Sequence, residues 1–319
     1  MHEVLDVRDL GPLDFNESRF AARARFHQAW YRAAVLRVVT HGASTHRGRT
    51  IPRGSILPEW AVARGMNFTS DEARSLYGRR RSEGWGLDPV RCQAHMTSSQ
   101  ALTLNLFGPL MDDTMWFARV LGVVLAEPVV KVLEVHLEHA PARPSFALGD
   151  RTIVDLWLSL SLPDGRTLSV VMEVKYCDRF NSRYLPVWDN DRYRRLTAEQ
   201  QQPSWDWDDP ALRSRTVNQL LRCHAMGEFL GRRSGSSSTR LVVLHHRSDQ
   251  SAIRAVSEYS SVAPRGTVVS SDLGAFVEAM RLGAVDQRQR EAAEALQQRY
   301  VDEDRSEALW DARGHVPLS

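Results

Sequence analysis

The chain has 319 residues, of which 43% are hydrophobic and 25% are charged, and these proportions exclude a disordered tail, a collagen-like repeat and a coiled coil. The formal net charge is only +2, and the three cysteines are too widely spaced for a disulfide scaffold or a zinc ribbon. No apolar run approaches the roughly 20 residues of a membrane span, and the N-terminus lacks the features of a secretory signal, so we expect a cytoplasmic protein with no membrane partner.

Positive charge is concentrated near the N-terminus. Thirteen arginines but only three acidic residues lie between Arg19 and Arg81, which gives this segment a charge of +10. A block this basic is typical of proteins that bind a polyanion, most often nucleic acid. A GC-rich genome that encodes arginine throughout would produce the same excess, and the sequence leaves both explanations open.

Residues 1–90 are predicted to form an arginine-rich, mostly helical N-terminal region. Apolar side chains recur at helical spacing over residues 20–39, and Ser70 is placed to cap a second helix that ends near Gly78. Glycine and basic residues over 41–53 predict a loop, and residues 84–89 predict a linker. We expect three arginines of the loop to contact nucleic acid: Arg47, Arg49 and Arg53.

From residue 91 onward, helical and extended patterns alternate. Helical patterns cover residues 101–110, 112–124, 216–230, 252–259, 271–280 and 285–300, and β-rich runs cover 129–137, 152–161, 168–175, 241–244 and 267–269. This order is typical of a mixed α/β domain with helices around a central sheet. We therefore expect an α/β core over residues 91–283 and a C-terminal helix, within residues 284–319, that packs on this core.

Three charged residues are unusual for the strands in which they occur. Asp155 interrupts the apolar run Ile153-Val154-Asp155-Leu156-Trp157, and an ionised carboxylate is costly to bury without a partner. The next strand ends in Glu173-Val174-Lys175, and residues two apart on a strand share a face. Only two of the 41 basic residues in the chain are lysines, so the lysine at 175 favours a role for its compact, titratable ammonium.

The turn between these two strands predicts their register. Pro163-Asp164-Gly165 is typical of a three-residue hairpin loop, in which a type I turn is followed by a left-handed glycine. With that loop, Leu162 pairs with Arg166, and Asp155 lies directly opposite Glu173. Opposed residues have Cβ atoms roughly 4.5–5.5 Å apart. A two-residue loop would instead turn Asp155 to the other face of the sheet.

Two carboxylates at this separation repel each other unless a cation lies between them. Hard oxygen ligands suit Mg²⁺, which keeps several waters and binds one or two carboxylates together with a substrate phosphate. Such an ion lowers the pKa of a bound water and stabilises the charge that develops on a phosphate, and an adjacent lysine positions or deprotonates the water. We expect an active site in which Asp155 and Glu173 bind the metal. The alternative is a structural Asp–Lys–Glu ion cluster at the end of a strand.

These residues together resemble the PD-(D/E)XK nuclease superfamily, which has a restriction-endonuclease-like fold. The resemblance covers roughly residues 97–244 and rests on Asp155 together with Ser98-Ser99-Gln100, Asn105-Leu106-Phe107, Glu173-Val174-Lys175-Tyr176-Cys177-Asp178 and Gln219-Leu220-Leu221-Arg222, with Arg299-Tyr300 later in the chain.

The resemblance assigns a role to each residue of the motif. It implies that Asp155 is the first acid, that Glu173 and Lys175 are the second acid and the lysine, and that Gln219 is the glutamine that several branches place on the following helix. Two positions depart from the family pattern. Val154 stands where a proline usually precedes the first acid, and the first helix offers neutral Gln100 and Asn105 where many members carry a glutamate.

The resemblance also implies a Mg²⁺-dependent endonuclease, with Mn²⁺ as a substitute, that hydrolyses double-stranded DNA to leave a 5′-phosphate in restriction, phage defence or repair. Arg213 and Arg215, just before the helix of Gln219, are further expected phosphate contacts. A homodimer or a partner subunit is compatible with the sequence. Three alternatives stay open: a catalytically silent module that binds DNA, a nuclease directed at RNA, and an assembly subunit whose basic segment contacts protein.

Overall fold

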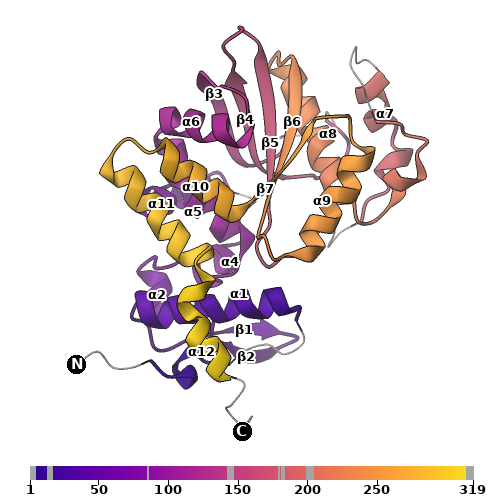
Figure 1. Ribbon diagram of the computed structural model, residues 1–319. Helices are drawn as coiled ribbons and strands as arrows, with labels where there is room; N and C mark the ends of the chain where they lie inside the picture. The colour runs from indigo at the N-terminus through magenta and orange to yellow at the C-terminus, as the bar shows by residue number, and fades with distance from the viewer. Residues whose placement is uncertain are drawn as a thin grey trace. The chain divides into compact units, whose positions relative to one another are not determined.

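The computed structural model describes residues 5–12, 17–84, 86–141, 147–178, 180, 184–198 and 205–313. The chain forms two compact units, and both ends of the chain belong to the first of them (Figure 1). Unit 1 comprises Met1–Glu83, Leu87–Pro109 and Asp286–Ser319, and unit 2 comprises Gly84–Gly86 and Leu110–Val285. In the described ranges, no helix has both the length and the apolar character needed to cross a membrane.

A five-stranded sheet forms the centre of unit 2. Its strands span Lys131–His139 (β3), Val154–Ser161 (β4), Thr167–Val174 (β5), Ser238–His245 (β6) and Val268–Asp272 (β7). They lie side by side in that order (Figure 1). β3, β4 and β5 pair antiparallel, whereas β5, β6 and β7 pair parallel, so the sheet is mixed. The predicted α/β fold with a central mixed sheet is confirmed.

Helices flank this sheet. They span Thr114–Val124 (α6), Asp191–Ala198 (α7), Asn218–Arg233 (α8), Gln250–Val262 (α9) and Leu273–Gly283 (α10), with short 3-10 turns at Val187–Asp189 (η4) and Pro210–Arg213 (η5). α8 packs on β4, β5 and β6, while α6 packs on β3 and on α10, which also contacts β6 and β7. The central strand β5 is therefore buried almost throughout, as its nearly continuous apolar run requires.

α8 lies close to the sheet because a glycine faces β5. A Cβ at Gly227 would lie 2.7 Å from Cγ1 of Val171, so a larger residue would force the helix or the strand to move. The Ser169 hydroxyl donates a hydrogen bond to the Gly227 carbonyl (3.0 Å) and accepts one from Trp157 Nε1 (2.9 Å). Because Ser169 and Val171 alternate with Glu173 along β5, all three side chains point toward α8.

The hairpin between β4 and β5 has the predicted register. Leu156 pairs with Met172, and the Leu162 N–H donates to the Arg166 carbonyl (2.9 Å). Gly165 has a φ of 85°, in the left-handed region that the last position of this loop requires. The three-residue loop is confirmed, and with it the alignment of the two acidic positions on one face.

Unit 1 is mostly helical. Its helices span Arg19–Trp30 (α1), Glu59–Ala63 (α2), Asp71–Ser82 (α3), Pro89–Ala94 (α4), Gln287–Tyr300 (α11) and Glu307–Ala312 (α12), and α5 (Ser99–Asp112) begins in this unit. Short helical turns cover Val7–Leu10 (η1), Tyr31–Val35 (η2) and Glu303–Ser306 (η6). The predicted cap at Ser70 is confirmed, because its hydroxyl accepts a hydrogen bond from the Ala73 N–H (3.2 Å).

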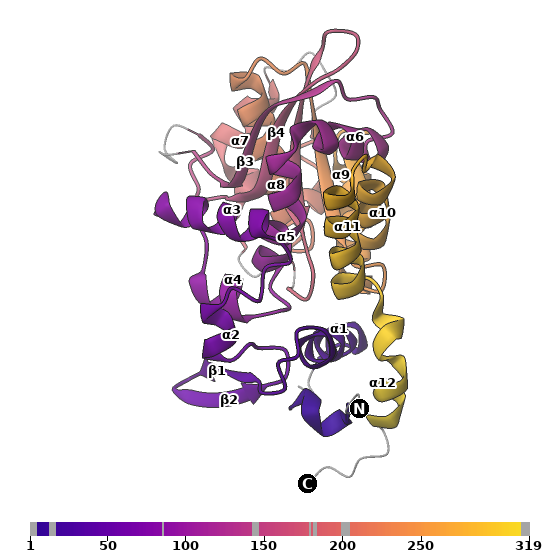
Figure 2. The same ribbon diagram turned by 90° about the vertical axis from the view of Figure 1, so that its left-hand side faces the viewer.

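The prediction of a loop over residues 41–53 is wrong. This segment forms an antiparallel hairpin of β1 (Gly42–His46) and β2 (Arg49–Arg53), which extends to one side of unit 1 (Figure 2). The turn consists of Arg47 and Gly48, whose φ values are 48° and 75°, and a two-residue type I′ turn needs both positions in this region. The glycines that suggested a loop therefore mark a hairpin turn, and Pro52 is tolerated because an isolated pair of strands has two open edges.

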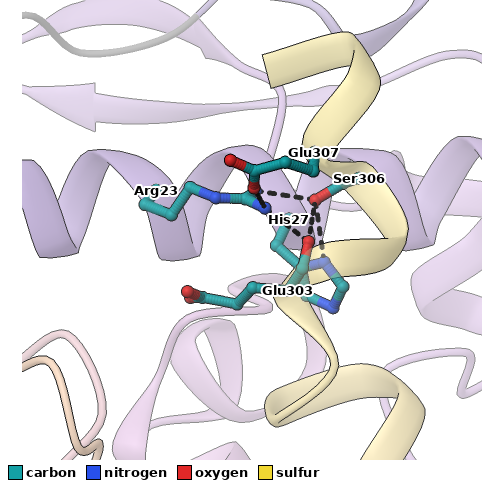
Figure 3. A network of polar contacts seen from close by, with 5 residues as sticks. All are labelled: Arg23, His27, Glu303, Ser306 and Glu307. Atoms are coloured by element: carbon teal, nitrogen blue, oxygen red, sulfur yellow. Dashed lines mark hydrogen bonds and ion pairs between the residues drawn. The ribbon is translucent and has the colours of Figure 1, made fainter. Parts of the chain in front are cut away.

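The C-terminal segment belongs to unit 1, whereas the sequence placed a C-terminal helix on the α/β core. Arg23 of α1 donates to Ser306 Oγ (2.7 Å) and forms an ion pair with Glu307 (2.7 Å) (Figure 3). His27, one helical turn further along α1, lies with Nδ1 3.1 Å from the same hydroxyl. These polar contacts fix η6 and α12 against the first helix of the chain.

A buried polar network in the same unit includes residues quoted for the family resemblance. Arg299 donates from Nη1 to the Asn67 carbonyl (2.7 Å) and from Nε to Gln28 Oε1 (3.2 Å). Asn105 Nδ2 donates to the Asn67 carbonyl (3.0 Å) and to the Tyr300 hydroxyl (2.8 Å). All five side chains are buried. The role of Asn105, Arg299 and Tyr300 in this structure is to join distant segments of unit 1.

Candidate active site

The two acidic residues of the predicted motif lie on neighbouring strands of unit 2. Asp155 is the second residue of β4, and Glu173 is the next-to-last residue of β5. The register of the hairpin, continued one step beyond the Leu156–Met172 pair, places the two residues opposite each other. Asp155 Oδ2 accepts a hydrogen bond from the Val174 N–H (2.7 Å), which fixes this carboxylate against the end of β5.

Glu173 is held by three side chains. Its Oε1 lies 2.7 Å from Lys175 Nζ and accepts a hydrogen bond from Gln219 Nε2 (2.6 Å), and its Oε2 accepts one from Cys223 Sγ (3.2 Å). The exposed fraction of Glu173 is only 1%, and that of Lys175 is 8%. Gln219 and Cys223 are four residues apart on α8 and therefore share the helix face that meets β5. The structure thus brings together all four predicted site residues and adds Cys223.

The charge of Lys175 is stabilised by the acids around it. Burial by itself lowers the pKa of the ammonium group, but Glu173 and Asp155 outweigh this effect, and the net shift raises the pKa. The ammonium also lies 5.1 Å from the centre of the Phe180 ring, a distance at which a cation is attracted to an aromatic face. Lys175 is therefore a cation at neutral pH in this arrangement, a donor of hydrogen bonds.

Burial and neighbouring acids outweigh the nearby Lys175 cation at Asp155. Burial raises the pKa of its carboxyl well above the ordinary value, and the negative charges of Glu173 and Glu138 raise it further. Lys175 and the Val174 amide act in the opposite direction but do not compensate. A carboxylate in this position would be stabilised by an added cation.

Glu138 is a third acid at this end of the sheet, and no pattern in the sequence indicated it. On β3, Leu137 pairs with Leu156 and His139 with Val154, so Glu138 lies across from Asp155. Its exposed fraction is 4%, and its φ of 47° is rare for a residue other than glycine. The predicted strand ended at residue 137, and the connection between β3 and β4 is too long for turn chemistry to set a register. The position of Glu138 beside Asp155 follows only from the pairing of β3 with β4.

The comparison with known families concerns nearly the whole chain. A model of the PD-(D/E)XK nuclease superfamily matches residues 15–302, nearly the whole chain. The chain belongs to this superfamily. PD-(D/E)XK proteins are nucleases, and they generally use divalent metal ions. No curated protein and no solved structure matches the chain. The match extends well beyond residues 97–244, where the sequence alone showed the resemblance, and it includes most of unit 1.

The donor atoms of Asp155 and Glu173 fit a hard divalent cation. Asp155 Oδ2 accepts the Val174 amide, whereas no hydrogen bond from the described part of the chain reaches its Oδ1. Glu173 contributes a second carboxylate on the same face. Among the described residues, no three His, Cys, Asp or Glu side chains converge into a closed metal cage. An ion held by Asp155 and Glu173 would keep open positions for water and phosphate, which suits Mg²⁺.

The arginines expected to contact nucleic acid lie in different surroundings. Arg213 is exposed at the end of η5, with its guanidinium 4.7 Å from the centre of the Trp188 ring. Arg215 is exposed just before α8, and no partner for its side chain occurs among the described residues. The other three expected arginines belong to the hairpin of unit 1: Arg47 in its turn, and Arg49 and Arg53 at the two ends of β2.

Proposed function

We propose that this protein is a Mg²⁺-dependent endonuclease that hydrolyses phosphodiester bonds in double-stranded DNA. The observation that carries the proposal is the convergence of Asp155, Glu173 and Lys175 on one face of neighbouring strands, with Gln219 on the helix above them. A restriction, phage-defence or repair setting follows from the family alone, and Mn²⁺ is expected to replace Mg²⁺.

Each residue of the site has a distinct role in this proposal. Asp155 and Glu173 hold the cation, which supplies Lewis acidity to the substrate phosphate and to the attacking water. Lys175, a cation itself, donates a hydrogen bond that orients this water or a non-bridging phosphate oxygen. Water adds to phosphorus and the bond from phosphorus to the 3′ oxygen breaks, which leaves a 5′-phosphate and a 3′-hydroxyl. Gln219 acts through Glu173, because it fixes the orientation of that carboxylate.

The proposed substrate contacts use exposed arginines. Arg213 and Arg215 precede α8, whose second residue is Gln219, so they lie close in sequence to the site and are proposed to bind backbone phosphates. Arg47, Arg49 and Arg53 of unit 1 are proposed to bind the same duplex. A second copy of the chain or a partner subunit is compatible with this proposal.

Cleavage of supercoiled plasmid tests the proposal. We expect nicking that requires Mg²⁺ and stops on addition of EDTA, and we expect Lys175→Met to slow it about 10²- to 10⁴-fold, the usual contribution of a positioned proton-transfer or charge-stabilising group. Lys131→Met is the matched control, since Lys131 is the other lysine of the chain and is exposed on β3. Equal rates for the two variants, or no cleavage of DNA with any divalent ion, would contradict the proposal.

One observation favours a catalytically silent binding module as the second candidate. Both oxygens of Glu173 already accept hydrogen bonds, and its ion pair with Lys175 is almost completely buried. Titration calorimetry with MgCl₂ and MnCl₂ separates the two candidates. A nuclease binds the ion, and Asp155→Asn abolishes the heat, whereas a silent module gives no heat in either form. Parallel assays with structured RNA would reveal a nuclease directed at RNA.

A further inference from the structure

The hairpin of β1 and β2 is an exposed, basic element of unit 1. Two five-residue strands meet at the Arg47-Gly48 turn, and Thr45, Arg49 and Thr50 beside the turn are exposed together with it. No aspartate or glutamate occurs between residues 18 and 58 of the sequence, so the hairpin has no acidic neighbour along the chain. Figure 2 shows its two strands running side by side away from α1.

The base of the hairpin is firmly attached, which is needed because an isolated pair of strands is marginally stable in water. The Gly42 N–H donates to the Ile56 carbonyl (2.7 Å), and the Gly54 N–H donates to the Pro12 carbonyl (3.0 Å). The buried guanidinium of Arg32 donates from Nε to the Gly54 carbonyl (2.8 Å). A Cβ at Gly54 would lie 2.1 Å from the Leu10 carbonyl oxygen, so the backbone here is packed without free space. The ribbon is therefore presented in a fixed orientation.

The arginines at the tip differ from the others in the same basic segment. Arg23 pairs with Glu307 and Arg25 with Glu17, and Arg32 donates to backbone carbonyls in the interior. In contrast, the structure gives no partner within its described ranges to Arg47 or Arg49. Several arginines of unit 1 thus form contacts within the unit, whereas the guanidinium groups of Arg47 and Arg49 are available to bind a ligand.

The dimensions of the hairpin suit the major groove of duplex DNA. A five-residue strand is about 16 Å long, at about 3.3 Å per residue. The major groove of B-form DNA is about 12 Å wide and about 8.5 Å deep and admits a two-stranded ribbon without distortion, whereas the minor groove is only about 6 Å wide and would have to widen. The tip can therefore reach the floor of a major groove while the base stays outside.

We propose that the β1–β2 hairpin inserts its tip into the major groove of duplex DNA, with Arg47 and Arg49 contacting phosphates and base edges there. The inference rests on the proposed function, which supplies the DNA, and adds the groove and the element that enters it. Arginine is suited to both contacts, because its planar guanidinium binds phosphate oxygens and the O6 and N7 atoms of guanine in the major groove.

The inference is tested by measuring how tightly the protein binds a fluorescein-labelled 30-base-pair duplex. Fluorescence anisotropy reports the binding, and EDTA prevents cleavage. We expect the full-length double variant Arg47→Ala/Arg49→Ala to bind at least about 10-fold more weakly. We also expect the slope of log affinity against log salt to fall by about 0.9 for each phosphate contact that is lost. The matched control is Arg265→Ala, because Arg265 is also exposed, also unpartnered in the described residues, and also followed by a glycine of positive φ in a turn. This control should bind as the unaltered protein does.

A second measurement identifies the groove. Duplex in which cytosine carries a glucosylated hydroxymethyl group blocks the major groove and should weaken binding of the unaltered protein, but should not weaken the double variant further. Netropsin, which occupies the minor groove, should have little effect. The inference is overturned if the double variant binds as tightly as the control, or if netropsin competes and glucosylation does not.

The outcomes for the hairpin and for the proposed function are separable. Plasmid cleavage by the unaltered protein with binding unchanged in the double variant would remove the hairpin from the interface and leave the nuclease intact. Failure of the unaltered protein to bind or cleave any duplex would remove both. Unchanged thermal unfolding of the double variant is the control for folding, since both side chains are exposed.

Discussion

Glu173 is the residue on which the arrangement of the site depends. A carboxylate on a mobile side chain has several orientations, but here Lys175 and Gln219 share one oxygen and Cys223 occupies the other. The Cys223 thiol is suited to this contact because its pKa lies well above the ordinary value. Burial is the main cause of this rise, and the negative charge of Glu173 adds to it. Cys223 therefore stays a neutral donor and does not become a thiolate that would repel the glutamate.

Removal of the Cys223 donor should reduce activity without abolishing it. We expect Cys223→Ala to slow Mg²⁺-dependent nicking about 5-fold, since one hydrogen bond of ordinary strength contributes about 1 kcal/mol. Cys223→Ser keeps a donor at this position and should restore most of the rate. Nicking rates measured over a series of Mg²⁺ concentrations test this, and a positioning role also predicts a higher Mg²⁺ requirement for the alanine variant. The same rate for all three proteins would show that the thiol does not position Glu173.

The site residues that could be predicted from sequence are those linked by local geometry. Asp155 and Glu173 follow from one turn and the alternation of two strands, and Gln219 follows from the family pattern. Glu138 could not be predicted, because residues 140–153 separate β3 from β4 and no local rule sets the register over that distance. Cys223 lies four residues after Gln219 on one helix face, but a buried cysteine is usually a small apolar residue, so its spacing alone gave no reason to assign it a role.

At the scale of elements, the packing of α8 on β5 positions the two side chains that donate hydrogen bonds to Glu173 from the helix. Gln219 and Cys223 reach Glu173 only because the helix approaches the strand closely at Gly227, and again at Gly231, where a Cβ would lie 2.7 Å from the Ser169 Cβ. The distance between helix and strand is thus set by glycines one turn apart on the same helix face as the two donors.

A methyl group at Gly227 should affect stability and catalysis together. We expect Gly227→Ala to lower the free energy of unfolding by about 1–3 kcal/mol, the usual cost of overpacking a core. We also expect slower nicking, because the helix moves the donors of Glu173 with it. Gly165→Ala is the control: it strains the hairpin turn, where φ is 85° and the added Cβ meets no atom, so it should cost about 1 kcal/mol and leave the rate nearly unchanged. Urea unfolding and nicking assays on both variants test this, and normal nicking by Gly227→Ala would contradict it.

Glycine also explains why several element boundaries were predicted inaccurately. The helix expected over residues 101–110 extends to Asp112 as α5, and a Cβ at Gly108 would lie 2.4 Å from the Ala73 Cα, so this glycine permits close packing within the helix. Gly78 likewise lies within α3. A glycine that ends a helix and a glycine that faces a neighbouring element look the same in one sequence, because only the tertiary contact distinguishes them.

At the scale of the whole molecule, the sequence could predict the sheet of unit 2 but not the composition of unit 1. The strands of unit 2 are signalled by local alternation and turns. Unit 1 depends on pairs such as Gln28 with Arg299, which are 271 residues apart, and on Asn105 with Tyr300, which are 195 apart. A polar side chain on the buried face of a helix needs a hydrogen-bond partner, but the sequence does not show which segment supplies that partner. The C-terminal helix was therefore expected on the α/β core, and it belongs with the first helix of the chain.

Two buried histidines should make the stability of the folded chain depend on pH. Burial lowers the pKa of His224 to about 3 and that of His246 to about 4, with nearby Arg240 and Arg247 adding to the effect. The Tyr259 hydroxyl accepts a hydrogen bond from Trp205 Nε1 (3.0 Å) and lies 2.9 Å from His224 Nδ1. As the pH falls below the ordinary histidine value of 6.5, the unfolded chain binds protons at these sites that the folded chain does not bind.

The free energy of unfolding should therefore decrease as the pH is lowered from 6.5 toward 4, by up to about 1.4 kcal/mol per pH unit for each histidine. His224→Gln cannot titrate and keeps a side chain that can form a hydrogen bond with the Tyr259 hydroxyl, so it should remove the contribution of one histidine from this slope. His136→Gln, at an exposed position of β3, is the control for replacing a histidine outside the buried pair. Urea unfolding followed by tryptophan fluorescence at pH 7, 6, 5 and 4 measures the slopes, and the same slope for His224→Gln as for the unaltered protein would show that His224 is protonated in the folded chain.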